Sequence, residues 1–151
     1  MSTARPEQRE LRAPTEADLP EIVRVMSEGW PEPADEELVR RQWTSPGFDV
    51  ASDARLDGAG CAVVQELGHD RVWIDLRGRP SVELIDWAEE RARQKGGRLL
   101  SGAWDSNESV LGELERRGFV VIRHAQRMVI DLTEPVPDPE WPDGIALRTF
   151  R

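Results

Sequence analysis

The apolar residues of this chain change their spacing near its middle, and this change constrains the fold more than any other feature. Residues 70–76 are predicted as a strand, with the apolar run Val72–Ile74 at its centre. Beyond residues 77–79 the apolar side chains recur at helical spacing, which predicts a helix over residues 80–94. Its inward stripe is expected to be Leu84, Ile85, Ala88 and Ala92. A strand that leads directly into a helix is typical of an α/β fold.

The other predicted elements surround this pair. Further strands are predicted for residues 10–13, 53–56, 60–67, 98–104 and 119–132. Further helices are predicted for residues 15–28, for residues 35–43, and from a cap at Ser106 or Asn107 to Gly118. Their inward residues are expected to be Leu19, Ile22, Val23 and Met26, then Leu38, Val39 and Trp43, then Val110, Leu111 and Leu114. Turn signals at Asp57-Gly58 and Gly68-His69-Asp70 favour an antiparallel meander, so the order βααβββαβαβ predicts a mixed, mostly antiparallel sheet with helices on both faces.

Composition limits the classes of function. The 151 residues suit one main domain, and the net charge of -9 argues against a nucleic acid or an anionic membrane as the main partner. A single cysteine, Cys61, excludes an internal disulfide, and with only His69 and His124 beside it no metal site is expected. The absence of a long apolar run in the sequence predicts a soluble, cytoplasmic protein.

Three segments resemble the GNAT superfamily of acetyl-CoA-dependent N-acetyltransferases. Residues 11–18 look like the first strand and capped helix of that family, and residues 72–92 like its central strand, cofactor loop and following helix. Residues 107–119 look like its late segment, which ends in Gly118-Phe119. The resemblance covers residues 10–133 and implies a GNAT-like mixed sheet, acetyl-CoA as cofactor and a small-molecule amine as acetyl acceptor.

In this family the pyrophosphate of coenzyme A lies on backbone amides at a helix N-terminus. By resemblance, the cofactor-binding residues are Ile74, Asp75, Leu76, Arg77, Gly78, Arg79, Ser81 and Asn107. The loop departs from the family pattern, because Arg79 and Ser81 stand where glycines let the ligand approach and Pro80 has no N–H. Either Arg77 and Arg79 replace the backbone donors by charge, or the loop is degenerate and Pro80 simply starts the helix at its first position.

The catalytic residues are harder to identify. The family's tyrosine, which protonates the leaving thiolate, falls on Leu114, and the chain contains no tyrosine at all. Glu66 and Asp75 are weak candidates for a general base, since the family often places one on these strands. Two hypotheses follow: a degenerate, non-catalytic domain that supports a catalytic partner, or a small-molecule N-acetyltransferase that acts in its own right.

The C-terminal residues predict a longer protein. Four prolines make residues 134–144 a stiff linker, and residues 145–151 repeat the Leu-Arg opening of residues 10–13. This arrangement resembles the N-terminal half of tandem GNAT proteins of the mycothiol synthase type. The resemblance implies a second GNAT domain C-terminal to Arg151, with catalysis retained in one half.

Overall fold

The computed structural model describes residues 10–28, 33–130, 133, 140–146 and 148. The chain divides into two units, residues 1–119 and residues 120–151, and each is described here by itself. All helices and strands found in the described residues lie in the first unit. They are η1 (Glu16–Asp18), α1 (Leu19–Ser27), α2 (Glu36–Trp43), α3 (Val50–Asp53), β1 (Ala54–Leu56), β2 (Gly60–Glu66), β3 (Arg71–Gly78), α4 (Val82–Lys95), β4 (Arg98–Ser101) and α5 (Glu108–Arg116).

The four strands form one sheet in the order β1-β2-β3-β4. The pairs β1–β2 and β2–β3 are antiparallel, which confirms the predicted meander, and β3–β4 is parallel. A parallel pair requires a crossover connection, and α4 supplies it. The predicted α/β fold, a mixed and mostly antiparallel sheet with helices on both faces, is therefore confirmed.

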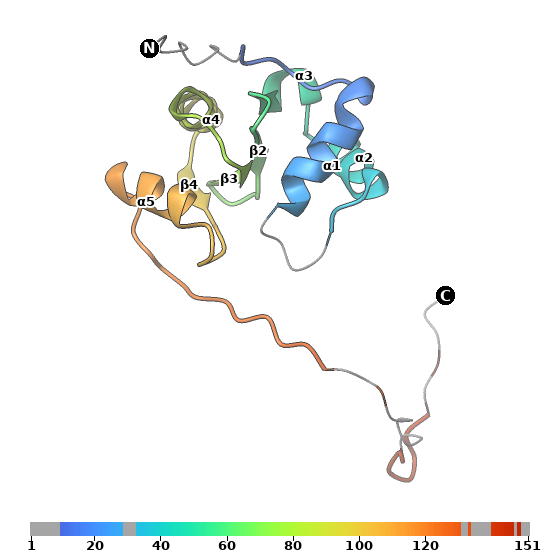
Figure 1. The fold of residues 1–151 in the computed structure, drawn as a ribbon. Coiled ribbons are helices and arrows are strands. Elements are labelled where there is room, and N and C mark those ends of the chain that lie inside the picture. The colour runs from blue at the N-terminus through green and yellow to red at the C-terminus, as the bar shows by residue number, and fades with distance from the viewer. Residues whose placement is uncertain (1–9, 29–32, 131–132, 134–139, 147, 149–151) are drawn as a thin grey trace. The chain divides into compact units, whose positions relative to one another are not determined.

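Each face of the sheet has its own apolar core, and the two helical layers lie on opposite sides in Figure 1. One core joins the inward residues of α4 and α5 to Val64 of β2 and to Val72, Ile74 and Leu76 of β3. The other joins α1 and α2 to Leu56 and Cys61. The neighbouring residues Cys61 and Ala62 of β2 therefore enter different cores, as the period of 2 in a strand requires.

The N-terminal segment is less regular than the sequence predicts. Residues 10–13 form only an isolated antiparallel bridge between Arg12 and Leu56, not a strand. Pro14 directly after them has no N–H and limits the pairing that they can make. The predicted helix over residues 15–28 is split into η1 and α1, with the Thr15 N–H donating to Asp18 Oδ2 over 2.8 Å at its start.

Two predictions about buried helical residues are wrong. Leu38 of α2 is 45% exposed, whereas Val39 is buried and Trp43 is half-buried in the adjacent core. Val25 of α1 was not predicted to face inward, yet it is fully buried. These helices are only eight and nine residues long, so the packing of each against the sheet decides which neighbouring residues it buries.

The sequence did not predict α3, a short helix that carries the buried acidic residue Asp53. The Asp53 side chain accepts from Arg91 Nη2 at 2.8 Å and from Lys95 Nζ at 3.1 Å, and both donors belong to α4. Burial raises the pKa of Asp53, but the Asp49 amide and these two cations outweigh burial and hold the pKa below its usual value. The ion pairs thus fasten α3 to the C-terminal half of α4.

The predicted strand over residues 119–132 is not formed in the part that the structure describes. Residues 120–130 belong to the second unit and contain neither helix nor strand. An extended segment becomes a strand only by hydrogen bonding to another strand, and the alternating sequence does not supply that partner. His124, expected to be a cross-strand residue, is exposed in this segment.

The predicted linker at 134–144 and the predicted start of a second domain at 145–151 lie largely outside the described residues. Among the described residues, no helix is long and apolar enough to span a membrane.

Candidate functional site

The parallel strands β3 and β4 separate after four paired positions. Their register runs from Arg71 opposite Arg98 to Ile74 opposite Ser101, and β4 then ends while β3 continues to Gly78. Ser101 marks the point of separation, where its Oγ donates to the Ile74 carbonyl over 2.9 Å. The helices α4 and α5 both begin beyond the C-terminal ends of these strands, which is where α/β sheets usually bind ligands.

The predicted cofactor-binding residues all lie at this end of the sheet, but their side chains point in different directions. Ile74 and Leu76 are buried in the core beneath α4, so their side chains are unavailable to a ligand. Asp75 and Arg77 lie on the opposite face and form an ion pair, with Arg77 Nε 2.7 Å from Asp75 Oδ1. The charge of Arg77, predicted to attract phosphate, is thus already beside a carboxylate.

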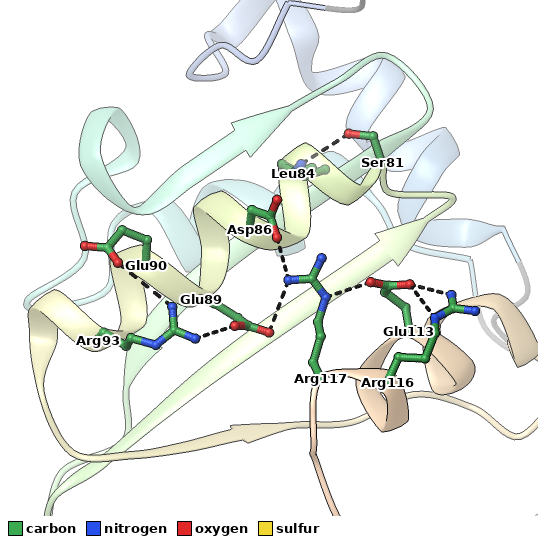
Figure 2. Close-up of polar contacts among 9 residues, drawn as sticks. All are labelled: Ser81, Leu84, Asp86, Glu89, Glu90, Arg93, Glu113, Arg116 and Arg117. Atoms are coloured by element: carbon green, nitrogen blue, oxygen red, sulfur yellow. Dashed lines mark hydrogen bonds and ion pairs between the residues drawn. The ribbon is translucent and has the colours of Figure 1, made fainter.

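The loop between β3 and α4 lies two residues further along the chain than predicted. β3 runs through Gly78, two residues beyond the predicted end of the strand, and α4 begins at Val82. Ser81 is the N-cap, and its Oγ accepts from the Leu84 N–H over 3.2 Å (Figure 2). The prediction that Pro80 starts the helix is therefore wrong, and its missing N–H removes no donor from the first turn of α4.

Two backbone N–H groups of this loop donate hydrogen bonds to the turn between β1 and β2. Asp57 is 3% exposed, and its Oδ2 accepts from the Ser81 N–H at the start of α4 over 2.7 Å. Its Oδ1 accepts from the N–H groups of Ala59 at 2.9 Å and Gly60 at 2.7 Å, which hold the carboxylate in place. The Ala59 carbonyl in turn accepts from the Arg79 N–H over 3.0 Å. A buried carboxylate of the chain itself thus lies against the loop that precedes α4.

The protonation of Asp57 follows from the same contacts. Burial alone raises the pKa of its carboxyl group. The amides of Ala59, Ser81 and Gly60 outweigh burial and hold the pKa below its usual value. Asp57 therefore remains ionised at neutral pH and places a full negative charge beside the N-terminus of α4, where the helix dipole favours it.

Two glycines allow the turn and the loop to approach this closely. A Cβ atom on Gly60 would lie 2.5 Å from the Pro80 Cα. A Cβ atom on Gly78 would lie 2.5 Å from the Ala59 carbonyl oxygen, and the φ of Gly78 is 67°. The sequence predicts only a turn at Asp57-Gly58; the signal for this contact is that Asp57 stands three positions before Gly60, the first residue of β2.

The two candidate bases are not brought together. The side chain of Glu66 is 61% exposed and lies 3.5 Å from Lys95 of α4. Glu66 pairs with Val72, whereas Asp75 lies three positions further along β3, so the two carboxylates are on opposite faces of the sheet. Only Asp75 is near the open edge of β3, beyond the point where β4 ends.

The face that carries Asp75 has little free space. Beside α1 and α2 there is a pocket of about 20 Å³, lined by Asp75, Arg77 and Cys61 among others. This volume is enough for about one water molecule. Burial raises the pKa of the Cys61 thiol to about 12, so this cysteine is a neutral packing residue and not a nucleophile.

The position of the family's tyrosine is filled by packing. Leu114 of α5 is 7% exposed and lies in the core with Val110 and the inward residues of α4. Asn107 caps α5, and its Oδ1 accepts from the Val110 N–H at 3.3 Å. Of the two predicted caps, Ser106 and Asn107, the structure therefore confirms Asn107. No phenol and no other acid side chain replaces the tyrosine at this core position.

An ionic network that the sequence did not reveal connects α5 to α4 (Figure 2). Arg117, directly after α5, reaches Asp86 Oδ1 at 2.6 Å and Glu89 Oε1 at 3.4 Å on α4, and Glu113 Oε1 at 2.8 Å on its own helix. The Arg117 side chain is only 14% exposed, so these pairs are less screened than ordinary surface pairs. Hydrogen bonds from Arg116 and Arg117 hold the pKa of Glu113 below its usual value.

The comparisons with known proteins agree with this geometry, although no family model matches the chain. A mycothiol acetyltransferase of Thermobispora bispora is 36% identical over 83 aligned positions, which take in 47% of this chain and 28% of that protein. The crystal structure of a GCN5-related N-acetyltransferase from Sphaerobacter thermophilus has 27% identity and a TM-score of 0.68. That match covers 96% of this chain and 54% of the solved chain.

The similarity to these two proteins supports the GNAT superfamily for this chain. An aminoglycoside N-acetyltransferase solved in complex with CoA shares the GNAT fold, with 18% identity and a TM-score of 0.50. That match covers 81% of this chain and 92% of the solved chain. The chain spans about half the length of the Sphaerobacter protein, and its match spans less than a third of the mycothiol acetyltransferase.

Proposed function

We propose that this GNAT domain is a non-catalytic half of a longer acetyltransferase, and that it supports a catalytic partner domain. The partner would transfer an acetyl group from acetyl-CoA to a small-molecule amine. The similarity to a mycothiol acetyltransferase and to an N-acetyltransferase about twice as long as this chain supports this assignment. The second GNAT domain is proposed to follow Arg151.

The observation that carries the proposal is the Asp57 carboxylate at the start of α4. A phosphate cradle needs several free backbone N–H groups that converge on one point. Here the Ser81 amide donates to Asp57 and the Arg79 amide donates to the Ala59 carbonyl. A pyrophosphate at this loop would have to displace both contacts and approach a buried negative charge, which strongly disfavours its binding.

The acid chemistry points the same way. Proton transfer to the leaving thiolate needs a donor within hydrogen-bonding reach, and the family uses a tyrosine. This chain has no tyrosine, and its corresponding residue, Leu114, is packed in the core. A domain that lacks both the open loop and the acid retains the sheet and helices with which it can pack against a partner.

The competing proposal is that this domain is itself a small-molecule N-acetyltransferase. The separation of β3 from β4 and the position of Asp75 beside that opening favour it. In that case Asp75 would take a proton from the amine through water.

Calorimetric titration of the 151-residue protein with acetyl-CoA at physiological salt distinguishes the two proposals. We expect weak or undetectable binding. Micromolar one-to-one binding that is weakened by the double change Arg77→Ala and Arg79→Ala would overturn the non-catalytic assignment. The matched control is Arg71→Ala with Arg98→Ala, which removes two exposed arginines from the opposite end of the same two strands.

A further inference from the structure

Helix α5 is fastened to the rest of the first unit by few side chains. Of its nine residues only Val110 and Leu114 are buried, whereas α4 buries five. Phe119, which follows the helix, is partly buried against the same core. Residues 102–107 before the helix contain neither helix nor strand. The helix is therefore held by a small apolar contact and by the ionic network around Arg117.

The helix is also weak by itself. Gly112 lies at its centre, and a glycine inside a helix is destabilising because its backbone loses the most freedom on folding. A Cβ atom on Gly112 would meet nothing within 4 Å, so packing does not require a glycine there. An isolated helix of nine residues is not stable in water. If α5 leaves the core, we therefore expect it to unfold.

The ion pairs between α5 and α4 are arranged so that they can open. The Glu89 Oε2 atom of α4 lies 2.5 Å from Arg93 Nη2 on the same helix (Figure 2). Glu113 of α5 pairs with Arg116 as well as with Arg117. Breaking a buried ion pair is costly chiefly because it leaves a charge without a partner. When Arg117 leaves α4, Glu89 retains its own cation, and Glu113 leaves together with both of its arginines.

The remaining contact of Arg117 is with a carboxylate that water already reaches. The side chain of Asp86 is 63% exposed, so it stays hydrated without the arginine. Arg117 is 14% exposed while α5 is in place, and it would gain water when the helix leaves. Each charged group of this contact is thus paired or hydrated in both states, which favours a contact that opens and closes reversibly.

We propose that α5 is a lid, which opens by local unfolding while the rest of the first unit stays folded, and that Arg117 is its latch. Opening would uncover the part of the core that Val110 and Leu114 cover, including the inward face of α4. Segments that open locally have few buried apolar contacts, and α5 has this property. The lid goes beyond the proposed function, because its opening requires neither acetyl-CoA nor a second domain.

Native-state hydrogen exchange of the 151-residue protein, followed at increasing low concentrations of urea, tests the proposal. We expect the amides of α5 to exchange at least about tenfold faster than those of α4. The exchange of α5 should also depend little on urea, because the urea dependence scales with the surface exposed on opening. Equal rates and equal urea dependence for the two helices would overturn the proposal.

A substitution in the other core separates local from global opening. Val39→Ala removes buried apolar atoms beside α1 and α2 and should destabilise the whole first unit. It should speed exchange in α4 and leave the exchange of α5 without urea unchanged, because opening of the lid does not disturb that core. Equal acceleration in both helices would overturn the proposal.

Two neighbouring arginines test the latch. Arg117→Gln removes the contacts with α4, whereas its matched control, Arg116→Gln, removes an ion pair with Glu113 of its own helix. Arg117→Gln should speed the exchange of α5 by about fivefold or more, and Arg116→Gln by less than about twofold. Equal effects of the two substitutions would contradict Arg117 as the latch. If Arg117→Gln does not fold, Asp86→Asn removes one contact of the latch and should speed the exchange of α5 by about twofold. An unchanged rate in that variant would likewise overturn the latch.

Discussion

The turn at residues 57–60 and the segment at residues 120–130 satisfy their backbone groups in opposite ways. In the turn, a buried carboxylate accepts three N–H groups, and a carbonyl accepts a fourth from the following loop. In the segment, apolar side chains face water and no strand is formed. In the first region the chain's own groups take up the backbone donors, whereas in the second large apolar side chains are exposed. The comparison teaches that regular structure and close packing in this chain go together with backbone groups that find partners within it.

The largest expected effect on stability comes from comparing a buried side chain of the first unit with an exposed side chain of residues 120–130. Leu114→Ala should lower the free energy of unfolding by about 2–5 kcal/mol, because it leaves a cavity beneath α5. Ile122→Ala in the exposed segment should change it by less than about 0.5 kcal/mol. Urea denaturation of both variants provides the measurement. Equal effects of the two substitutions would remove the distinction between a packed unit and an exposed segment.

Substituting two glycines of similar φ shows how much the close contact between the turn and the loop contributes to stability. Gly78 and Gly68 have φ values of 67° and 68°, but a Cβ on Gly68 meets nothing within 4 Å. Gly68→Ala should therefore cost only about 1–2 kcal/mol of left-handed strain. Gly78→Ala should cost about 2–4 kcal/mol, because its Cβ also meets the Ala59 carbonyl oxygen at 2.5 Å. Similar melting temperatures for the two variants would show that the turn does not press on the loop.

The smallest expected effect concerns the charge in the turn. Asp57→Asn should cost about 1–3 kcal/mol at pH 7, because an amide NH₂ would face a buried N–H donor. Urea denaturation of the wild-type protein and the variant at pH 7 measures this difference. The matched control is Asp75→Asn, which changes a carboxylate on β3 that lies outside the turn.

The same substitution should alter the acid limb of the stability profile. The pKa of Asp57 is lowered on folding, so its contribution is fully present above the unfolded pKa of about 3.9 and is lost as the pH falls through the folded pKa. The wild-type protein should therefore lose stability below about pH 4, and Asp57→Asn should lose less over that range. Some acid dependence should remain in the variant, since the pKa of Asp53 is lowered as well. If the free energy of unfolding of the two proteins fell equally as the pH was lowered, the ionised Asp57 carboxylate would not be what stabilises this loop.

The local arrangement of the fold was predictable because it depends on neighbouring residues. The strand over residues 70–76 and the helix over residues 80–94 follow from a change in apolar spacing that the structure confirms to within a few residues. The cap at Asn107 and the closing glycine at position 118 are local signals as well. The GNAT fold and the lack of a tyrosine could likewise be read from the chain alone.

What the sequence by itself determined is thus the order of the elements, the fold class and the absence of the family's acid. Only the tertiary structure decided that Asp57 reaches Ser81 across 24 residues, that Arg117 joins α5 to α4, and that residues 120–130 contain no helix or strand. Periodicity reports which residues a single element buries, because that depends on the geometry of one helix or strand. Contacts between distant residues depend on how close two elements come, and at the site that distance was set by two glycines whose missing side chains let the turn reach the loop.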